Sequence, residues 1–425
     1  MEGKEPLQIA FPWEFPDSTR HFRHGSLPYQ MPILLLTIML AGMGFGLVLP
    51  AFLFFAENLG ASPMIATTIV GSYSLGQFIA NPFWGRMSDR YGRKPILLLS
   101  TGGMVIAYLL MAFAENLWML GAARFMTGVM GANVPVAMAY ITDVTPIEKR
   151  AQGMGLVGGA ISIGFIVGPA FGGLLSGADA DSATLMWPGI GAAALCCFTL
   201  IATFFLKESL PAEKRAQNHA NDDGPKGLAA MRMVLRRPTV TRLIVIGFLI
   251  YFAMGFFETI MPLWSESRFG WGPRDIGLCF TYLGLVVAIT QGFLVGKLVP
   301  KFGESKLVLF GVASYCFGLL WMTQVPSWEW MLFGITFTAG GGAIAVTSMT
   351  SLVSRQAGEH ERGLVLGVYN SSAWMGRFIG PPCSGFLFQT IAVQAPLYGA
   401  ALIMFSCFWA VRALRSHLKR SAAAA

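Results

Sequence analysis

Two long apolar runs near the start of the chain are separated by the short stretch GRMSDRYGRKP, residues 85–95. The run before it reads IATTIVGSYSLGQFIANPFW, and the run after it reads ILLLSTGGMVIAYLLMAFA. Each run has close to the roughly 20 apolar residues that an α-helix needs to cross a bilayer. The stretch is therefore expected to be a charged loop between two membrane-spanning helices.

The composition extends this interpretation to the whole chain. Of the 425 residues, 54% are hydrophobic and only 12% are charged, and the mean hydropathy is +0.59. A soluble protein carries about 25% charged residues. The apolar runs are continuous rather than alternating, which predicts an all-α membrane protein with twelve transmembrane helices and not a barrel. The runs cover residues 31–56, 64–84, 96–114, 117–139, 151–176, 185–206, 240–264, 275–297, 306–325, 329–353, 363–388 and 392–413.

The positions of the basic residues predict the orientation of the chain. Nearly all of the 30 Lys and Arg fall in the two tails and in loops on the side of the termini. Arg268 and Arg274 are on the opposite side, and Arg124 and Arg377 lie inside spans. Because cytoplasmic loops collect Lys and Arg, both termini are expected in the cytoplasm. The net charge of +8 is thus assigned to membrane flanks and not to nucleic-acid binding.

The second half of the chain repeats features of the first half at an offset of 211 or 212 residues. Gly168 and Pro169 in one apolar run match Gly380 and Pro381 in another. Such a repeat indicates two parallel six-helix halves, with a solute site in the cleft between them. The predicted divisions are a cytoplasmic N-terminal tail 1–30, a first half 31–206, a cytoplasmic linker 207–239, a second half 240–413 and a cytoplasmic C-terminal tail 414–425.

Three motifs resemble those of the major facilitator superfamily, and in particular its twelve-span drug/proton antiporters of the multidrug or tetracycline efflux type. GRMSDRYGRK is similar to the family's loop 2–3 signature at Gly85, Arg86, Asp89, Arg90, Gly92, Arg93 and Lys94. GFIVGPAFGG is similar to the antiporters' span-5 motif at Gly164, Gly168, Pro169, Gly172 and Gly173. LGAARFMTGVMGA is similar to their span-4 motif at Arg124 and Gly128, although Thr127 stands where a glutamine is usual.

The resemblance implies that the loop 2–3 signature is a gate latch. Asp89 would cap the N-terminus of span 11, where helix amides and dipole favour an anion. Arg86, Arg93 and Asp143 would complete an ionic cluster that clamps the halves at the cytoplasmic face. In the second half, Glu304 stands at the Arg93 position, so the latch is expected to be asymmetric. The alternative is that this stretch only anchors the topology.

Span 5 is expected to pack closely against a neighbour. Gly164, Gly168 and Gly172 recur every four residues and therefore share one helix face, which lets another helix approach. Pro169 removes a backbone hydrogen bond and bends the helix. This pattern predicts a sliding seam between the halves, against span 8. Ordinary tight packing without motion is the alternative.

Ionisable residues inside spans are costly and usually functional. Arg124, Glu258 and Arg377 are the three candidates, and we assign them to proton coupling. Glu258 is the expected proton carrier, because burial raises and a nearby Arg lowers the pKa of a carboxyl, so that a moving Arg would switch its protonation. A fixed structural Glu–Arg pair is the alternative.

A mixed apolar cavity with few charges is expected between the halves, which suits an amphiphilic organic solute. Its predicted polar and aromatic walls are Tyr73, Gln77, Asn133, Tyr251, Phe257, Gln291, Asn370 and Trp374. The sequence offers no catalytic motif, and its six scattered cysteines have no metal-ligand spacing, so neither an enzyme nor a cofactor or metal site is expected.

The functional hypothesis is a secondary transporter in the bacterial inner membrane that works by alternating access. It would export a small organic compound in exchange for protons. Its expected partners are this compound, protons and the lipid bilayer, with no nucleic acid, and the chain is expected to be a monomer. The alternatives are a symporter or facilitator that imports a metabolite, a lipid or glycolipid flippase, and a receptor that transports nothing.

Overall fold

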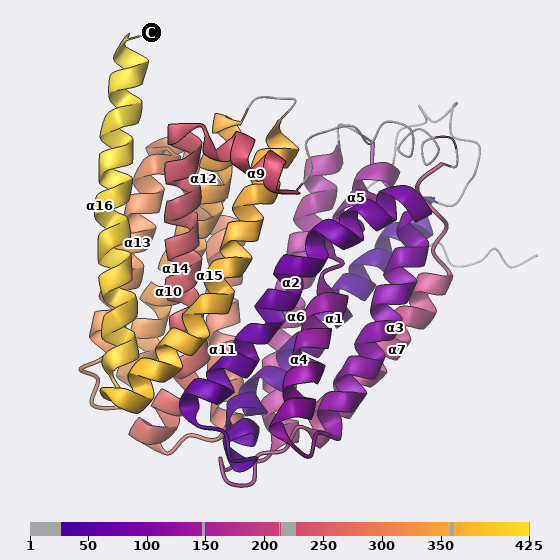
Figure 1. The fold of residues 1–425 in the computed structure, drawn as a ribbon, viewed down its shortest axis with the longest axis vertical. Helices are drawn as coiled ribbons and strands as arrows, with labels where there is room; N and C mark the ends of the chain where they lie inside the picture. The colour runs from indigo at the N-terminus through magenta and orange to yellow at the C-terminus, as the bar shows by residue number, and fades with distance from the viewer. Residues whose placement is uncertain (1–26, 147–148, 212, 214–226, 358–360, 425) are drawn as a thin grey trace, which may run out of the picture.

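The computed structural model describes residues 27–146, 149–211, 213, 227–357 and 361–424, which form helices joined by short loops (Figure 1). No strand occurs in these residues, so the predicted all-α fold is confirmed. The first half contains α1 (Leu27–Asn58), α2 (Pro63–Tyr91), α3 (Arg93–Ala112), α4 (Leu117–Gly131), α5 (Val134–Val144), α6 (Arg150–Ser176) and α7 (Met186–Phe204). Helices α4 and α5 together make one span, which is interrupted at Asn133.

The second half begins after the short helix α9 (Gly227–Leu235), which lies in the predicted linker. It contains α10 (Pro238–Phe269), α11 (Pro273–Ile289), the π-helical turn η2 (Thr290–Val295), α12 (Gly296–Phe302), α13 (Glu304–Met322), α14 (Trp328–Gln356), α15 (Arg362–Thr390) and α16 (Ala395–Ala424). Elements α11, η2 and α12 follow one another without a break and make one span.

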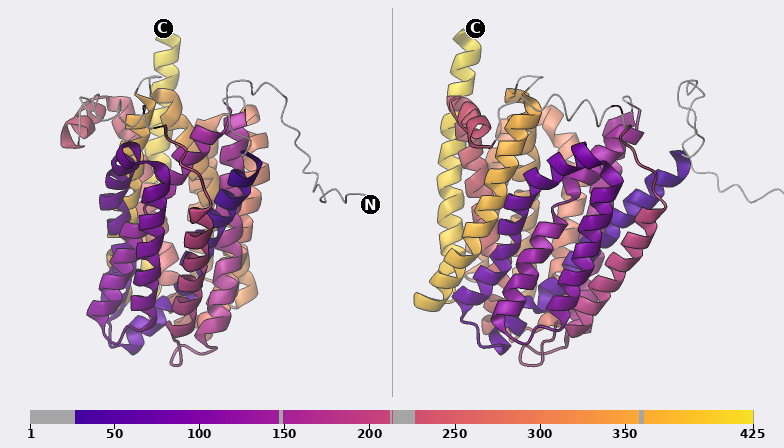
Figure 2. Two further views of the ribbon diagram at one scale, coloured as in Figure 1. Left: turned by 90° about the vertical axis from the view of Figure 1, so that its right-hand side faces the viewer. Right: turned by 45° about the vertical axis from the view of Figure 1, so that its right-hand side comes forward.

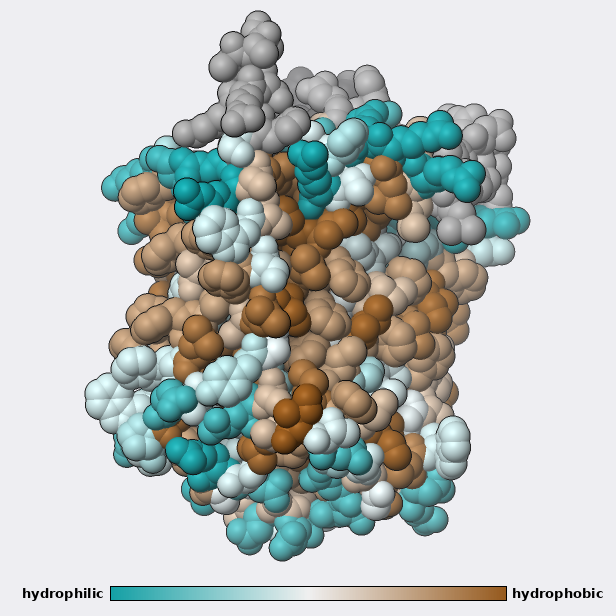
Figure 3. All heavy atoms as spheres, turned by 60° about the vertical axis from the view of Figure 1, so that its left-hand side comes forward, coloured by the Kyte–Doolittle hydropathy of each residue, from teal (hydrophilic) through white to brown (hydrophobic). Residues whose placement is uncertain are grey.

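Ten helical segments in the described part of the chain are long and apolar enough to cross a membrane. The other two of the twelve predicted runs lie in α2 and α15, which have 29 residues each but are more polar. These two helices pack along each other across the two halves, so less of their surface needs to face lipid. One face of the molecule shows a broad band of hydrophobic side chains between hydrophilic ones at both ends (Figure 3).

The helices α1–α7 gather on one side of the molecule and α10–α16 on the other (Figures 1 and 2). Two seams join these halves, where α2 packs along α15 and α6 packs along α11. We call the end of the bundle that carries the C-terminus and α9 the basic end, because most Lys and Arg are assigned to it, and the other the opposite end. The two predicted halves are therefore present as compact, separate groups of helices.

The seams are closed toward the opposite end of the bundle. A Cβ atom added to Gly385 of α15 would lie 2.7 Å from the carbonyl oxygen of Pro63 at the start of α2. A Cβ added to Gly277 of α11 would lie 2.9 Å from the Cα atom of Gly173 in α6. Such distances show backbones in direct contact, which only glycine allows.

The same four helices are not packed in this way toward the basic end. A Cβ added to Gly85 of α2, Gly155 of α6, Gly292 of η2 or Gly367 of α15 would meet no atom of the described residues within 4 Å. The ribbons of the two halves likewise meet at the lower end of Figure 1 and diverge at its upper end. The close packing of the described residues between the halves is therefore concentrated toward the opposite end.

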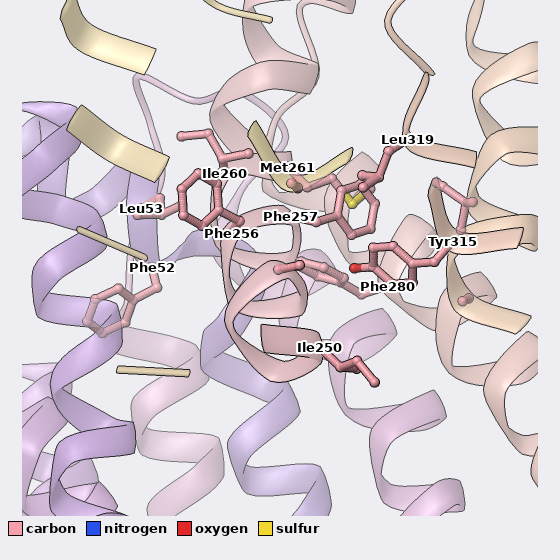
Figure 4. Packing of buried hydrophobic residues seen from close by; sticks show 14 of the residues in the cluster. Phe52, Leu53, Ile250, Phe256, Phe257, Ile260, Met261, Phe280, Tyr315 and Leu319 are labelled. Carbon is pink, nitrogen blue, oxygen red and sulfur yellow. The ribbon is translucent and has the colours of Figure 1, made fainter. Parts of the chain in front are cut away.

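An apolar core continues from one half into the other. Figure 4 shows Leu53 of α1 beside Phe256 and Ile260 of α10, and all three are nearly inaccessible to solvent. Phe257 of the same helix faces the ring of Tyr315 on α13, with the two ring centres 6.2 Å apart. Helix α10 therefore contacts both the first half and the interior of its own half.

The glycine face of α6 packs within the first half and not across the seam, which corrects the prediction. A Cβ on Gly168 would lie 2.7 Å from the carbonyl oxygen of Met43, and one on Gly172 would lie 2.7 Å from the carbonyl carbon of Leu47, both in α1. Helix α11 does contact α6 as predicted, but on another face, at Gly173. Sequence spacing shows that the glycines share a face, but it does not show which neighbour that face meets.

Replacing Gly168 by alanine is expected to destabilise the protein by about 1–3 kcal/mol, because the new methyl group overpacks the α1–α6 contact. Gly159 lies on the same helix, and a Cβ added to it would meet no atom of the described residues within 4 Å. Replacing Gly159 by alanine is therefore expected to stabilise the protein by roughly 0.5–1 kcal/mol through helix propensity. Thermal unfolding of the two purified variants in detergent measures both effects. Equal shifts of the midpoint would contradict the α1–α6 packing described above.

Candidate functional site

A cavity of about 420 Å³ lies between the two halves. Its first-half walls come from α1, α2, α4 and α6, and its second-half walls from α10, η2 and the helices α11, α13, α14 and α15. Most lining side chains are apolar or aromatic, among them Phe45, Leu49, Phe165, Met254 and Val287. Of the residues predicted for it, Tyr73, Tyr251, Phe257, Gln291 and Trp374 do line the cavity, and so do Arg124, Glu258 and Arg377.

Glu258 of α10 and Arg377 of α15 form a two-point ion pair in this cavity. The carboxylate accepts from Nη2 of Arg377 at 3.1 Å through Oε1, and its Oε2 lies 3.0 Å from Nη1. The guanidinium also lies over the ring of Tyr251, 5.7 Å from its centre. Both charged side chains are 29% exposed, so solutes in the cavity can reach the pair. Both residues of the pair belong to the second half.

Arg124 of α4 has a different environment. It is only 1% exposed, and its Nε and Nη1 atoms have no hydrogen-bond partner in the part of the chain that the structure describes. Its guanidinium carbon lies 4.9 Å from the ring centres of Phe52 and Tyr73 and 5.1 Å from that of Phe45. The three predicted coupling residues therefore separate into one ion pair and one arginine surrounded by aromatic rings.

Three residues predicted for the cavity do not line it. Gln77 is buried and donates to the hydroxyl of Tyr73 at 2.9 Å, so it orients that cavity residue from behind. Asn133 lies at the break between α4 and α5 and donates to Ser100 of α3 at 2.9 Å. Asn370 is exposed on α15 outside the lining. A polar residue in a span can serve packing between helices of one half as well as a cavity.

Sequence reasoning missed two features of the cavity. Tyr315, which is not among the predicted wall residues, reaches it from α13, and its buried hydroxyl has no hydrogen-bond partner among the described residues. Gln291 lies in the π-helical turn η2, and such turns occur frequently at functional sites. No pattern in the sequence of these apolar spans distinguishes either feature.

The loop 2–3 signature forms an ionic cluster at the basic end, centred on Arg93. Its Nη1 donates to Asp89 at 2.6 Å and to Ser88 at 2.7 Å, and its Nε donates to Asp143 of α5 at 3.2 Å. All of these residues belong to the first half. Arg86 instead donates to the carbonyl oxygen of Pro82, outside the predicted cluster.

The carboxylate of Asp89 binds Arg93 within the first half, and the residue at the N-cap position of α15 is Glu361. The cap on span 11 and the latch that the resemblance implies stay predictions.

Glu208, which the sequence analysis did not consider, completes the cluster. Its two carboxylate oxygens accept from the backbone N–H groups of Arg93 at 2.9 Å and Lys94 at 3.1 Å, at the start of α3. A carboxylate is favoured there by the helix dipole and by the unpaired amides. Gly92 has φ +108°, and a Cβ on it would lie 2.8 Å from Cδ of Glu208, so this turn requires glycine.

The second half carries the same ion pair with its charges exchanged. At the repeat offset, Arg93 matches Glu304 and Asp143 matches Arg355. Oε1 of Glu304 lies 2.9 Å from Nη2 of Arg355 and accepts from Ser351 at 3.3 Å. The two halves thus differ in the sign of the charge at each of these two positions. In both halves an ion pair joins two helices at the basic end, α3 with α5 in the first half and α13 with α14 in the second.

The comparisons with known proteins identify a family. The sequence model of the Major Facilitator Superfamily matches residues 34–304 and 243–424. The chain is 31% identical over 353 residues to the class B tetracycline resistance protein of Escherichia coli, which covers 82% of this chain and 86% of that protein. It is 28% identical over 383 residues to multidrug resistance protein 2 of Bacillus subtilis (strain 168), with 88% and 92% covered.

Two solved structures share the fold. A bacterial homolog of the human lysosomal transporter Spinster superposes with a TM-score of 0.76 at 13% identity, over 92% of this chain and 98% of that one. The human organic anion transporter MFSD10 superposes with a TM-score of 0.68 at 23% identity, over 91% and 100%.

Reversing one charge of the second-half pair is expected to destabilise the protein. Glu304→Arg would place a guanidinium beside Arg355 in a largely buried position, at a cost on the order of 1–3 kcal/mol. Adding Arg355→Glu should restore most of the stability. Lys301→Glu, a reversal at an exposed site on α12, serves as the control and should change little. Thermal unfolding compares the four proteins, and no recovery in the double variant would contradict the pairing.

Proposed function

The chain belongs to the major facilitator superfamily, whose members are transporters and not enzymes, and on this basis we propose that it exports an amphiphilic organic compound in exchange for protons. Several of its relatives are named tetracycline or multidrug resistance proteins, which supports export of a drug-like compound. The cavity supports an amphiphile, because apolar and aromatic side chains form most of its wall and only three lining residues are charged.

The observation that carries the proposal is the exposed ion pair between Glu258 and Arg377. Glu258 supplies the only carboxylate among the described residues that line the cavity. An ionised Glu258 binds Arg377, whereas a protonated Glu258 would release it. A solute whose cationic or N–H group lies beside Glu258 would favour the ionised form. By linkage, protonation would then weaken solute binding by the same factor, which is the condition for exchange.

Alternating access follows from the arrangement of the halves. The seams α2–α15 and α6–α11 are closely packed at the opposite end, and we propose that the cavity is reached from the basic end, where the ribbons of the two halves diverge (Figure 1). The reverse state would open these seams and bring the basic ends together. There Asp89, whose side chain is 51% exposed, would reach the N-terminus of α15 and complete the latch.

The basic end is proposed to face the cytoplasm. The loops and tails assigned to this end hold nearly all Lys and Arg, which supports cytoplasmic termini under the positive-inside rule. We further propose residence in the bacterial inner membrane and function as a monomer, because each half contributes walls to one cavity within a single chain.

Replacing Glu258 by glutamine is expected to abolish solute-driven proton movement, because the amide keeps the shape of the side chain but cannot titrate. Purified protein is reconstituted into liposomes that contain a pH-sensitive dye, a pH gradient is imposed, and lipophilic cations, antibiotics and small metabolites are added. Wild type should show proton flux on addition of a transported compound. The expected loss in Glu258→Gln is at least about tenfold.

Glu329→Gln serves as the matched control, since Glu329 lies in the first turn of α14, outside the cavity lining, and its carboxylate accepts a hydrogen bond from the Ser327 hydroxyl. This variant should behave as wild type. Undiminished flux in Glu258→Gln would show that Glu258 is structural. Equilibration of a labelled metabolite or lipid without any proton flux would replace antiport by facilitated transport or lipid flipping.

A further inference from the structure

Arg124 is a buried charge for which the described part of the chain provides no counter-charge. It is 1% exposed, and two of its three nitrogens have no hydrogen-bond partner among the described residues. Arg377, in the same cavity, satisfies its guanidinium with both oxygens of Glu258. A guanidinium is always ionised in proteins, and a buried charge without a partner is strongly unfavourable. Something outside the described chain is therefore expected to complete this site.

The aromatic rings around Arg124 stabilise its charge but do not use its N–H groups. Phe45, Phe52 and Tyr73 place their ring centres within 4.9–5.1 Å of the guanidinium carbon, which is the geometry of cation–π contact. The hydroxyl of Tyr73 accepts from Gln77. The rings thus fix the orientation of the guanidinium, while Nε and Nη1 remain without an acceptor.

The neighbouring helices provide no acidic residue for Arg124. The described part of α1, which packs beside it, has Glu57 as its single acidic residue, near the far end of that helix. On α2 the acidic residue is Asp89, which binds Arg93 at the basic end. Glu258 is already paired with Arg377. The cavity therefore has two guanidiniums and one carboxylate, and its net charge is positive.

We propose that Arg124 binds an anionic group of the transported compound, such as a carboxylate or sulfonate. Guanidinium groups bind such oxyanions with two parallel hydrogen bonds, and Nε and Nη1 of Arg124 have no acceptor among the described residues. The apolar body of the compound would lie on Phe45, Leu49 and Phe165, which line the same cavity. The ring of Tyr73 contacts Arg124, and its centre lies 6.4 Å from that of Trp374 on α15, the helix that also carries Arg377.

This inference rests on the proposed function only in taking the cavity as the transport site. The anionic group at Arg124 would select the compound, and exchange with protons would take place separately at Glu258. A compound with an anionic group and a cationic or N–H group, separated by an aromatic body, would satisfy both regions. Binding tests the first role and proton flux tests the second, so the two proposals can fail independently.

The test compares the affinity of acids with that of their uncharged relatives. Full-length protein in nanodiscs of neutral lipid, in chloride-free buffer, is titrated with ciprofloxacin and its methyl ester, and with naphthalene-1-acetate and its amide. Dissociation constants are measured by isothermal titration calorimetry. In wild type, at least one acid should bind about tenfold or more tightly than its partner, the range of a charge-assisted hydrogen bond.

The preference should fall to less than about twofold in Arg124→Gln and should be partly retained in Arg124→Lys, which keeps the charge but not the planar donor pair. Arg412→Gln is the matched control, because Arg412 also lies over an aromatic ring, that of Trp409, but is exposed on α16 away from the cavity. Its acid preference should equal that of wild type. Size-exclusion profiles verify that each variant is folded.

Three results would overturn the proposal. The first is the absence of acid preference for both pairs in folded wild type, and the second is a preference that persists in Arg124→Gln. The third is stabilisation of wild type, but not of Arg124→Gln, by chloride without any acid preference, which would assign the site to an inorganic ion. An Arg124-dependent acid preference without proton flux would support this inference and contradict the proposed exchange.

Discussion

Close contact between helix backbones at glycine positions holds the two halves together. In a bilayer, apolar helices gain little from leaving lipid, so association depends on close packing. Gly385 against Pro63 and Gly277 against Gly173 supply this contact at the opposite end of the two seams. Glycines nearer the basic end on the same helices have no such neighbours. The cavity lies between the two halves that this packing joins.

Charge inside the bundle is organised in two ways that follow from the low dielectric of the interior. Glu258 and Arg377 neutralise each other within one half, with partial access for solutes. Arg124 lies among three aromatic rings, and its Nε and Nη1 have no hydrogen-bond partner among the described residues, in a cavity whose described lining has excess positive charge. At the basic end, Arg93 with Asp143 and Glu304 with Arg355 show that the repeat preserves an ion pair even when each sign is exchanged.

Several site residues could be predicted because their chemistry conflicts with their surroundings. An ionisable side chain inside an apolar run is improbable without a role, which identified Arg124, Glu258 and Arg377 from the sequence. Uncharged polar residues are less informative, since Asn133 and Gln77 serve contacts within the first half. Glu208 was not predicted, because its sequence position after a span is typical of any solvated loop carboxylate. Only the three-dimensional structure shows that the start of α3 lies beside it.

The sequence by itself determined the all-α membrane fold, the number of apolar runs and the two-fold repeat, because the bilayer imposes helix length and apolar composition on each span. It also identified the charged residues that such a fold must accommodate. Only the tertiary structure decided that the glycines of α6 face α1, that Glu258 binds Arg377, and that Arg124 has no acidic partner among the described residues. These three features depend on how each helix is rotated about its axis and on which helices surround it. Side-chain packing between segments that are distant in the sequence sets both, so no local sequence pattern predicts them.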